Sequence, residues 1–238
     1  MTFQADIHIH TCLSPCADLE MSPSEIADTA KTAGLDMLGI ADHNSVRNLP
    51  AHQEACSRKN IIPIFGIEVA TQEEAHILCI FPDLKAAEEF GDFLYSYIPD
   101  IENDPERFGD QVVVDVDENV LDFEEKYLGS AAELSIDALF EEVTMRRGLF
   151  IPAHIDKPVF SIPSQLGFLP DMAYSAVEMT RPAPNGVKYP YPIICNSDSH
   201  YLEDIGTRRF SINSQSPGFW ELTEALKAKN VETIFSVK

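Results

Sequence analysis

The sequence predicts an α/β protein, because short apolar runs alternate with helical patterns along most of the chain. A strand, a helix and another strand in succession imply parallel pairing through crossover helices. The length of 238 residues also suits one larger domain, since α/β barrels routinely exceed about 200 residues as single units. We therefore expect one domain that spans residues 1–238.

The first elements expected are a strand over Phe3–His10 and a helix that begins after Ser22. Ser22 and Glu25 have the spacing of a capping box, and Pro23 between them suits the first helical turn. Gly34 suits the left-handed position at which such a helix ends. Further strands are expected over residues 35–40, 61–69, 76–81, 149–153, 176–179 and 193–196, followed by a helix introduced by Ser216-Pro217 and an apolar tail over residues 231–237.

Residues 83–147 interrupt this alternation. In order, they contain a helical pattern at 84–98, an acidic stretch with a proline at 100–110, a hairpin pattern at 112–121 and a second helical pattern from Ser135 to Arg147. The segment is too small to carry much core of its own, so we expect an insertion within the same domain.

The composition restricts the possible partners. The chain carries 17 Lys and Arg against 39 Asp and Glu, a formal charge of −22, and 45% of its residues are hydrophobic, which excludes global disorder. An acidic protein repels polyanions, so we expect it to bind no long nucleic acid, whereas bound divalent cations would still allow a small phosphorylated substrate such as a nucleotide.

The sequence also predicts the compartment. There is no uninterrupted apolar run long enough to span a membrane, and the first ten residues lack the basic and apolar regions of a secretory signal. Five cysteines without a repeating spacing suit free thiols in a reducing environment. We expect a cytoplasmic protein that does not bind membranes.

Six of the seven histidines fall at ends of the expected strands. The residues concerned are His8, His10, His43, His154 and His200 after strands, His76 at the start of one, and Glu68 and Asp198 at similar positions. The carboxyl ends of strands form the active-site face of an α/β barrel, and imidazole with carboxylate suits Zn, Fe or Mn. Since unpartnered polar groups at the ends of apolar strands cost free energy, the set predicts a metal site. His52, within a helical pattern, is interpreted as structural.

The order and spacing of these residues resemble the PHP family, the polymerase and histidinol phosphatase superfamily of metal-dependent phosphoesterases. His8-Ile9-His10 is similar to the first HxH motif of the family, Ala41-Asp42-His43 to its TDH segment, Gly66-Ile67-Glu68 to the segment of its bridging Glu and Asp198-Ser199-His200 to its closing DxH. The resemblance covers nearly the whole chain. It implies a distorted (β/α)7 TIM-like barrel that binds two or three divalent transition metals, Zn, Mn or Fe.

The resemblance also implies a role for each residue. The first ion would be bound by His8, His10, Glu68 and Asp198, the second by Glu68, His76 and His154, and the third by Asp18, His43 and His200. Glu68, His76, His154 and Asp198 would be the catalytic residues. Thiolate ligation by Cys12 or Cys16 is an alternative that the sequence leaves open.

The chemistry implied is hydrolysis of a phosphate ester by a metal-activated hydroxide in a trinuclear site. The substrate would be a small phosphorylated metabolite, a nucleotide or a short oligonucleotide end. Lys157, Arg181 and Arg208 are the expected phosphate-binding residues, with Arg47 and Arg209 as further candidates. Two other functions remain open, namely a metal-dependent hydrolase of C–N bonds, similar to amidohydrolases, and a non-catalytic metal-binding interaction module.

Overall fold

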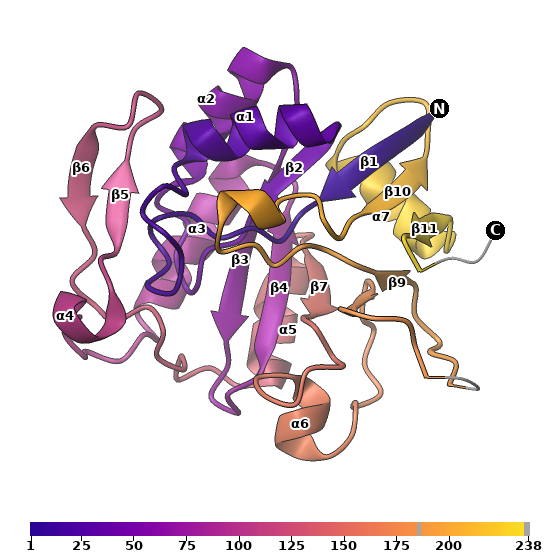
Figure 1. Cartoon of the computed structure of the whole chain (residues 1–238). Coiled ribbons are helices and arrows are strands. Elements are labelled where there is room, and N and C mark those ends of the chain that lie inside the picture. The colour runs from indigo at the N-terminus through magenta and orange to yellow at the C-terminus, as the bar shows by residue number, and fades with distance from the viewer. Residues whose placement is uncertain (185–186, 236–238) are drawn as a thin grey trace.

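The computed structural model describes residues 1–184 and 187–235. Its main sheet contains β1 (Thr2–Asp6), β2 (Met37–Ile40), β3 (Ile62–Ala70), β4 (His76–Phe81), β7 (Leu149–Pro152), β10 (Phe210–Asn213) and β11 (Val231–Thr233). These seven strands follow the order β11-β10-β1-β2-β3-β4-β7 and form a curled sheet (Figure 1). The predicted α/β class is therefore confirmed.

The strand directions differ from the expectation of parallel pairing throughout. β1, β2 and β3 are parallel, whereas β4 runs antiparallel to both β3 and β7, and β10 runs antiparallel to β1. A five-residue connection joins β3 to β4, which is too short for a crossover helix. Because of this reversal, the first residue of β4, His76, pairs with Ala70 at the end of β3.

A short parallel pair of strands lies between β7 and β11, the two edge strands of the sheet. It consists of β8 (Val177–Glu178) and β9 (Ile193–Ile194). The chain after β9 then runs beside the chain after β1, where Asp198 N–H donates to the His8 carbonyl and His10 N–H donates to that of Ser199, both at 2.9 Å. The curled sheet is thus a half-barrel continued by sparse hydrogen bonds, and a regular count of seven strand–helix units stays a prediction.

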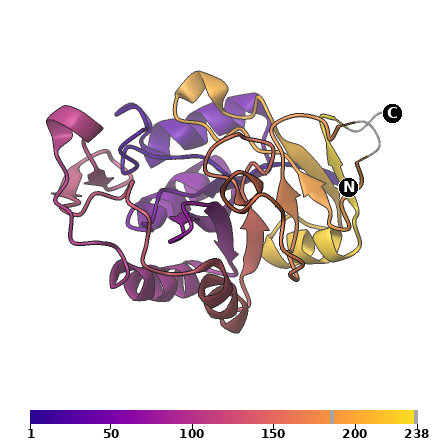
Figure 2. The ribbon, with the colours of Figure 1, turned by 90° about the horizontal axis from the view of Figure 1, so that it is seen from below.

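Helices cover the outer surface of the sheet (Figure 2). They are α1 (Pro23–Ala33), α2 (Leu49–Lys59), α3 (Leu84–Tyr95) and α5 (Ile136–Met145). The helix α7 (Phe219–Lys227) packs against the opposite face, and α4 (Pro105–Phe108), α6 (Ile162–Leu166) and the 3-10 helix η1 (Leu202–Asp204) are shorter. Ser22 caps α1 by accepting from Glu25 N–H, and Gly34 ends it at a φ of 76°. The Ser22 N–H donates to Glu20, so only half of the expected capping box forms.

The range 83–147 contains more of the main fold than the sequence indicated. The Phe90 ring of α3 lies 4.8 Å from that of Phe81 in β4, and Phe140 of α5 packs edge-on against Phe150 in β7. These two helices therefore cover the sheet. The part that lies to its side is α4 with the hairpin of β5 (Val112–Val114) and β6 (Val120–Phe123) (Figure 1).

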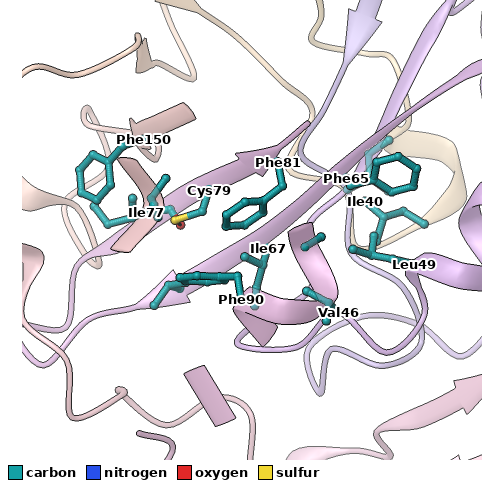
Figure 3. Close-up of a cluster of buried hydrophobic side chains, with 14 of the residues drawn as sticks. Ile40, Val46, Leu49, Phe65, Ile67, Ile77, Cys79, Phe81, Phe90 and Phe150 are labelled. Atoms are coloured by element: carbon teal, nitrogen blue, oxygen red, sulfur yellow. Dashed lines mark hydrogen bonds between the residues drawn. The ribbon is translucent and has the colours of Figure 1, made fainter. Parts of the chain in front are cut away.

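The alternation of β3 explains how one carboxylate comes to face the inside of the curl. Phe65, Ile67 and Val69 pack into the outer core with residues of β4 and α3, as the close-up in Figure 3 shows for Ile67, Phe81 and Phe90. Side chains alternate along a strand, so Ile64 and Glu68 share the opposite face. Ile64 belongs to the inner cluster, and Glu68 lies beyond it towards the end of the strand.

Two expectations concern the termini and the membrane. Among residues 1–184 and 187–235, no helix has the length and hydropathy needed to cross a bilayer. Of the apolar tail expected over residues 231–237, β11 forms the first part, and residues 236 and 237 lie outside the described residues.

Candidate metal centre

The centre of the site is the Glu68 carboxylate, which five imidazoles contact. Its Oε1 lies 3.1 Å from His76 Nδ1, 3.1 Å from His154 Nε2 and 3.3 Å from His8 Nε2, and its Oε2 lies 3.1 Å from His43 Nδ1 and 3.3 Å from His10 Nε2. Glu68 is 1% exposed, so these contacts form out of water. Such a density of nitrogen donors around one carboxylate is a typical arrangement for binding cations.

A second carboxylate, from the C-terminal part of the chain, completes the centre. Asp198 Oδ1 lies 3.3 Å from His10 Nε2 and 3.6 Å from His8 Nε2, and its Oδ2 forms an ion pair with the ammonium of Lys157. Residues separated by about 190 positions in the sequence thus meet in one buried cluster.

The backbone places each of these residues at the same end of the sheet. His8 and His10 lie on the continuation of β1, and His43 follows β2, where it forms a bridge with Glu68 of β3. His76 opens the antiparallel β4, which is why the start of a strand can supply a residue to a site built from strand ends. His154 and Asp198 follow β7 and β9 with φ angles of 30° and 54°. Positive φ values in non-glycine residues store strain and cluster at functional sites.

Buried polar groups orient the imidazoles from behind. His8 Nδ1 lies 3.0 Å from Glu178 Oε1, and His10 Nδ1 lies 3.0 Å from the hydroxyl of Ser14. Ser14 in turn donates to Asp42 at 2.7 Å. Partners of this kind fix the ring orientation of metal-binding histidines. The sequence analysis missed Glu178 and Ser14, and gave Asp42 no role beyond its place in the motif.

The ionisation of the centre depends on charge more than on burial. Burial alone would raise the pKa of Glu68, but the imidazoles of His76, His8 and His43 hold it well below its usual range. Burial would lower the pKa of His10, yet the carboxylates of Asp198 and Glu68, each 3.3 Å from its Nε2, raise it to about 9. A proton on this imidazole thus supplies part of the positive charge that the carboxylates require, and a bound cation supplies the same charge.

Unsatisfied atoms show that the residues present fit a metal. His8 Nε2 and His10 Nε2 are buried and lack a hydrogen-bond partner, although both face the carboxylates. Leaving such polar atoms unpaired inside a protein costs about 1–3 kcal/mol each. A cation bound by these lone pairs and by the carboxylates would remove that cost.

Within residues 1–184 and 187–235, three groups of donors lie close enough to hold an ion. They are His8, His10, Glu68 and Asp198; His43, Glu68 and His76; and His10, Cys16, His43 and His200, and in each group the donor atoms lie within 4.8 Å of one another. The first group contains the residues expected for the first ion. His154 contacts Glu68 next to the second group, as expected for a ligand of the second ion.

Asp18 is an expected metal ligand, but the structure does not place it near the other expected ligands. It is exposed, and its carboxylate accepts a hydrogen bond from Glu20 N–H at 2.9 Å, two residues further along its own loop. It belongs to none of the donor groups found among the described residues, where Cys16 lies instead beside His43 and His200. Cys12, the other thiol considered, is buried and directs its S–H to the Val112 carbonyl.

The expected phosphate-binding cations differ in their exposure and in the contacts that they already make. Lys157 lies at the centre, 36% exposed, with Asp198 as its partner. Arg181 is 67% exposed and pairs with Asp156. Arg208 donates to the carbonyls of Asn196 and Ser197, so its guanidinium holds the segment before Asp198 and has little capacity left for a phosphate.

The two further candidates also have other partners. Arg209 donates to the Ala33 carbonyl at the end of α1. Arg47 pairs with Asp122 of β6 and with Glu124, which directly follows this strand. His52 is buried in the core, where its Nε2 lies 3.0 Å from the Leu38 carbonyl.

A cavity of about 310 Å³ opens onto the cluster. Its lining consists of Pro15, Cys16, His43, His76, Arg107, Phe108, Tyr127, Gly129 and Phe160. Larger hollows of about 750 and 670 Å³ lie along the β5–β6 hairpin and contain none of the clustered histidines. The smaller cavity, which His43 and His76 line, therefore gives a substrate access to the donors.

Comparison with known proteins identifies the family and the fold. The family model of the PHP domain matches residues 6–149. The lesion-specific endonuclease Q from Pyrococcus furiosus superposes with a TM-score of 0.70 at 19% identity, over 98% of this chain and 58% of that one. A complex of endonuclease Q with a 27-mer duplex substrate that carries an abasic lesion gives 0.69 at 19% identity, over 96% and 57%.

Other relatives extend the comparison. A two-domain protein from Bacteroides vulgatus, which contains a predicted PHP-like metal-dependent phosphoesterase, gives a TM-score of 0.59 at 14% identity over 99% of this chain and 65% of that one. The chain therefore spans less than two thirds of the length of these relatives. No curated protein matches the sequence.

One expectation about partners is wrong. The net charge of −22 led us to expect no long nucleic acid as a partner, yet endonuclease Q, which has a similar fold, binds a DNA duplex. The reason is that net charge counts every surface carboxylate equally, whereas the field at a substrate is set by the nearest charges. Bound cations in the pocket can reverse that local field.

Proposed function

The chain belongs to the PHP family, and on that premise we propose that it is a metal-dependent phosphoesterase that hydrolyses phosphodiester bonds of DNA. The family and the structural relatives support a hydrolytic enzyme. The observation that carries the proposal is the buried Glu68 carboxylate, in contact with five imidazoles and adjacent to Asp198. In this proposal residues 1–238 act as one domain.

The donors divide among three ions. His8, His10, Glu68 and Asp198 would hold the first, Glu68 would bridge to a second with His76 and His154, and His43 and His200 would contribute to a third. Bound divalent metals would activate water and neutralise the charge that develops on the phosphate. Glu68 and Asp198 would supply the negative charge that holds these ions, because their carboxylates lie among the imidazoles.

Lys157 is the residue that we assign to the phosphate. Its ammonium reaches Asp198 at the edge of the cluster while its side chain remains 36% exposed. When cations compensate Asp198, this ammonium becomes free to bind a non-bridging phosphate oxygen. Burial lowers the pKa of Lys157, but Asp198 raises it above its usual value, so the side chain stays charged.

The mouth of the cavity suits a nucleotide. The exposed Phe160 ring stacks on His76 at 4.9 Å, and Phe108 stacks on Tyr127 at 4.2 Å. The guanidinium of Arg107 lies 5.2 Å from the Phe108 ring. Aromatic faces beside a cation bind unpaired bases through stacking, with little sequence preference. We therefore favour DNA in which a base is unpaired or missing over a fully paired duplex.

The proposal is tested with the metal-loaded protein on two labelled 27-mer duplexes, one with an abasic site and one fully paired. We expect metal-dependent cleavage of the lesioned duplex, loss of that cleavage with chelator and a loss of at least about a thousandfold in Glu68→Gln. His52→Gln, a change in the core away from the donors, is the matched control and should cleave normally. Absence of cleavage of any DNA by the fully metal-loaded wild type would overturn the proposal.

A further inference from the structure

Cys16 lies in a group of metal-binding donors with His43 and His200, where the resemblance implied Asp18 as the third ligand. It belongs to the loop after β1 and lines the cavity beside His43 and His76. Its sulfur lies within 4.8 Å of donor nitrogens of His10, His43 and His200. Among the five cysteines, all of which the structure describes, Cys16 alone is exposed.

Hydrogen bonds fix the loop that carries this thiol at both ends. Thr11 N–H donates to Asp42 at 2.6 Å at its start, and Asp18 N–H donates to the His200 carbonyl at 2.9 Å at its end. Between them, Ala17 N–H donates to the Ser14 carbonyl in a tight turn. The loop therefore holds the backbone of Cys16 next to His200.

The imidazoles beside Cys16 supply an independent indication of a ligand. His10 is fully buried, and its unpartnered Nε2 faces the carboxylates that would hold the first ion, so the first and third ion positions would adjoin each other. The rings of His200 and His43 lie 4.4 and 4.5 Å from the His10 ring, so three imidazoles surround one point next to the sulfur. His200 Nδ1 lies 2.9 Å from the Asp198 carbonyl and donates to it, which leaves Nε2 as the donor to a metal.

We propose that Cys16 binds the third ion as a thiolate, together with His43 and His200, in the place expected for Asp18. This inference rests on the proposed function, because it concerns one of the three ions of that site. As the metal–sulfur bond forms, the S–H bond breaks and its proton passes to solvent. A sulfur ligand makes this ion position prefer Zn²⁺ or Co²⁺ to Mn²⁺ or Mg²⁺, which favour oxygen.

The test is spectroscopic and does not depend on turnover. The metal-free full chain is titrated with Co²⁺, and a thiolate-to-cobalt charge-transfer band is followed in the near ultraviolet while bound metal is counted. We expect the band in the wild type, and its loss in Cys16→Ala together with one bound equivalent. Cys16→Asp should restore the lost equivalent without the band, because an oxygen ligand replaces sulfur.

Two matched variants separate the rival ligands. Cys12→Ala, which removes the buried thiol of the same loop, and Asp18→Ala, which removes the exposed carboxylate, should both keep the band and the full metal count. A wild type without the band at full metal loading, or a band unchanged in Cys16→Ala, would overturn the inference. Neither result affects the proposed function, which fails only if the loaded wild type does not cleave DNA.

Discussion

His8 Nδ1 lies 3.0 Å from Oε1 of Glu178, and both residues are buried at 0% and 1% exposure. The opposite ring nitrogen of His8 lies 3.3 Å from Glu68. One imidazole is therefore held between two carboxylates, of which only Glu68 faces the other histidines. Glu178 also accepts from His154 N–H and from the Asn196 amide, so it links three segments that carry residues of the site.

Replacement of Glu178 by Gln is expected to weaken metal binding without removing any donor. An uncharged amide no longer favours the Nδ1–H form of His8, and the basicity of Nε2 falls. Loss of such a partner typically lowers metal affinity by about 10- to 100-fold. Competition with a chromogenic chelator measures this affinity directly.

Glu203→Gln serves as the control, because Glu203 is an exposed acid in η1 and carries the same charge change. It should bind metal like the wild type. If Glu178→Gln also binds metal with unchanged affinity, the Glu178 carboxylate does not contribute to metal binding by His8.

The sequence could not identify Glu178 as a partner of His8. It lies in the short apolar run 176–179, and no motif marks it. Glu178 lies in β8, and only the folded chain, in which β8 pairs with β9, brings it to a histidine 170 residues away. The same limit applies to Cys16 and Asp18, which are two positions apart, since the turn of their loop decides which of them reaches His200.

Other parts of the site follow from the sequence with ordinary rules. His8 and His10 share a face because they are two apart on an extended segment, and Gly34 ends α1 in the left-handed conformation expected for it. His76 is intermediate between these cases. Its strand was predicted, but its contact with Glu68 requires β4 to run antiparallel, which hydrophobic patterns do not determine.

The second prediction concerns Lys157→Met, which keeps much of the apolar stem and removes the ammonium. If Lys157 binds a substrate phosphate, the KM for DNA should rise by about tenfold while metal binding is retained. The slope of log affinity against log salt concentration should also become shallower by about one, as expected when a single phosphate contact is lost.

Arg181→Met is the matched control, since Arg181 is 67% exposed and pairs with Asp156 outside the cluster. It should change the KM and the salt slope by less than twofold. An unchanged salt slope in Lys157→Met would mean that Lys157 does not contact the phosphate and that another cation does, such as Arg107 at the mouth of the cavity.

The third prediction is that DNA binding depends only weakly on salt. Few cations line the approach to the cluster, and the chain carries a charge of −22. With about two phosphate contacts, affinity should fall by about tenfold between about 50 and 200 mM salt, whereas proteins with many such contacts lose about a thousandfold or more. Fluorescence anisotropy with labelled duplex at saturating metal measures the slope.

The fourth prediction uses His52, which is remote from the donors. Burial lowers the pKa of His52 to about 4, because the enclosed ring resists a charge, and the hydrogen bond from its Nε2 to the Leu38 carbonyl opposes this shift only in part. The unfolded chain therefore binds a proton near pH 6.5 that the folded chain resists until about pH 4. Stability is complete above the unfolded value and falls as the pH is lowered, by about 2 kcal/mol between pH 7 and pH 5 from this group alone.

His52→Gln removes the titration and keeps an N–H donor for the Leu38 carbonyl. Its free energy of unfolding at pH 7 should be lower than that of the wild type, because the imidazole is fully buried and lies 3.5 Å from the Cys56 sulfur. The decrease from pH 7 to pH 5 should nevertheless be smaller in the variant by about 2 kcal/mol. Urea unfolding of both proteins in chelator isolates this difference, since the metal-site histidines contribute equally to each. Equal decreases in the two proteins would mean that His52 takes up its proton in the folded state, in conflict with its enclosure.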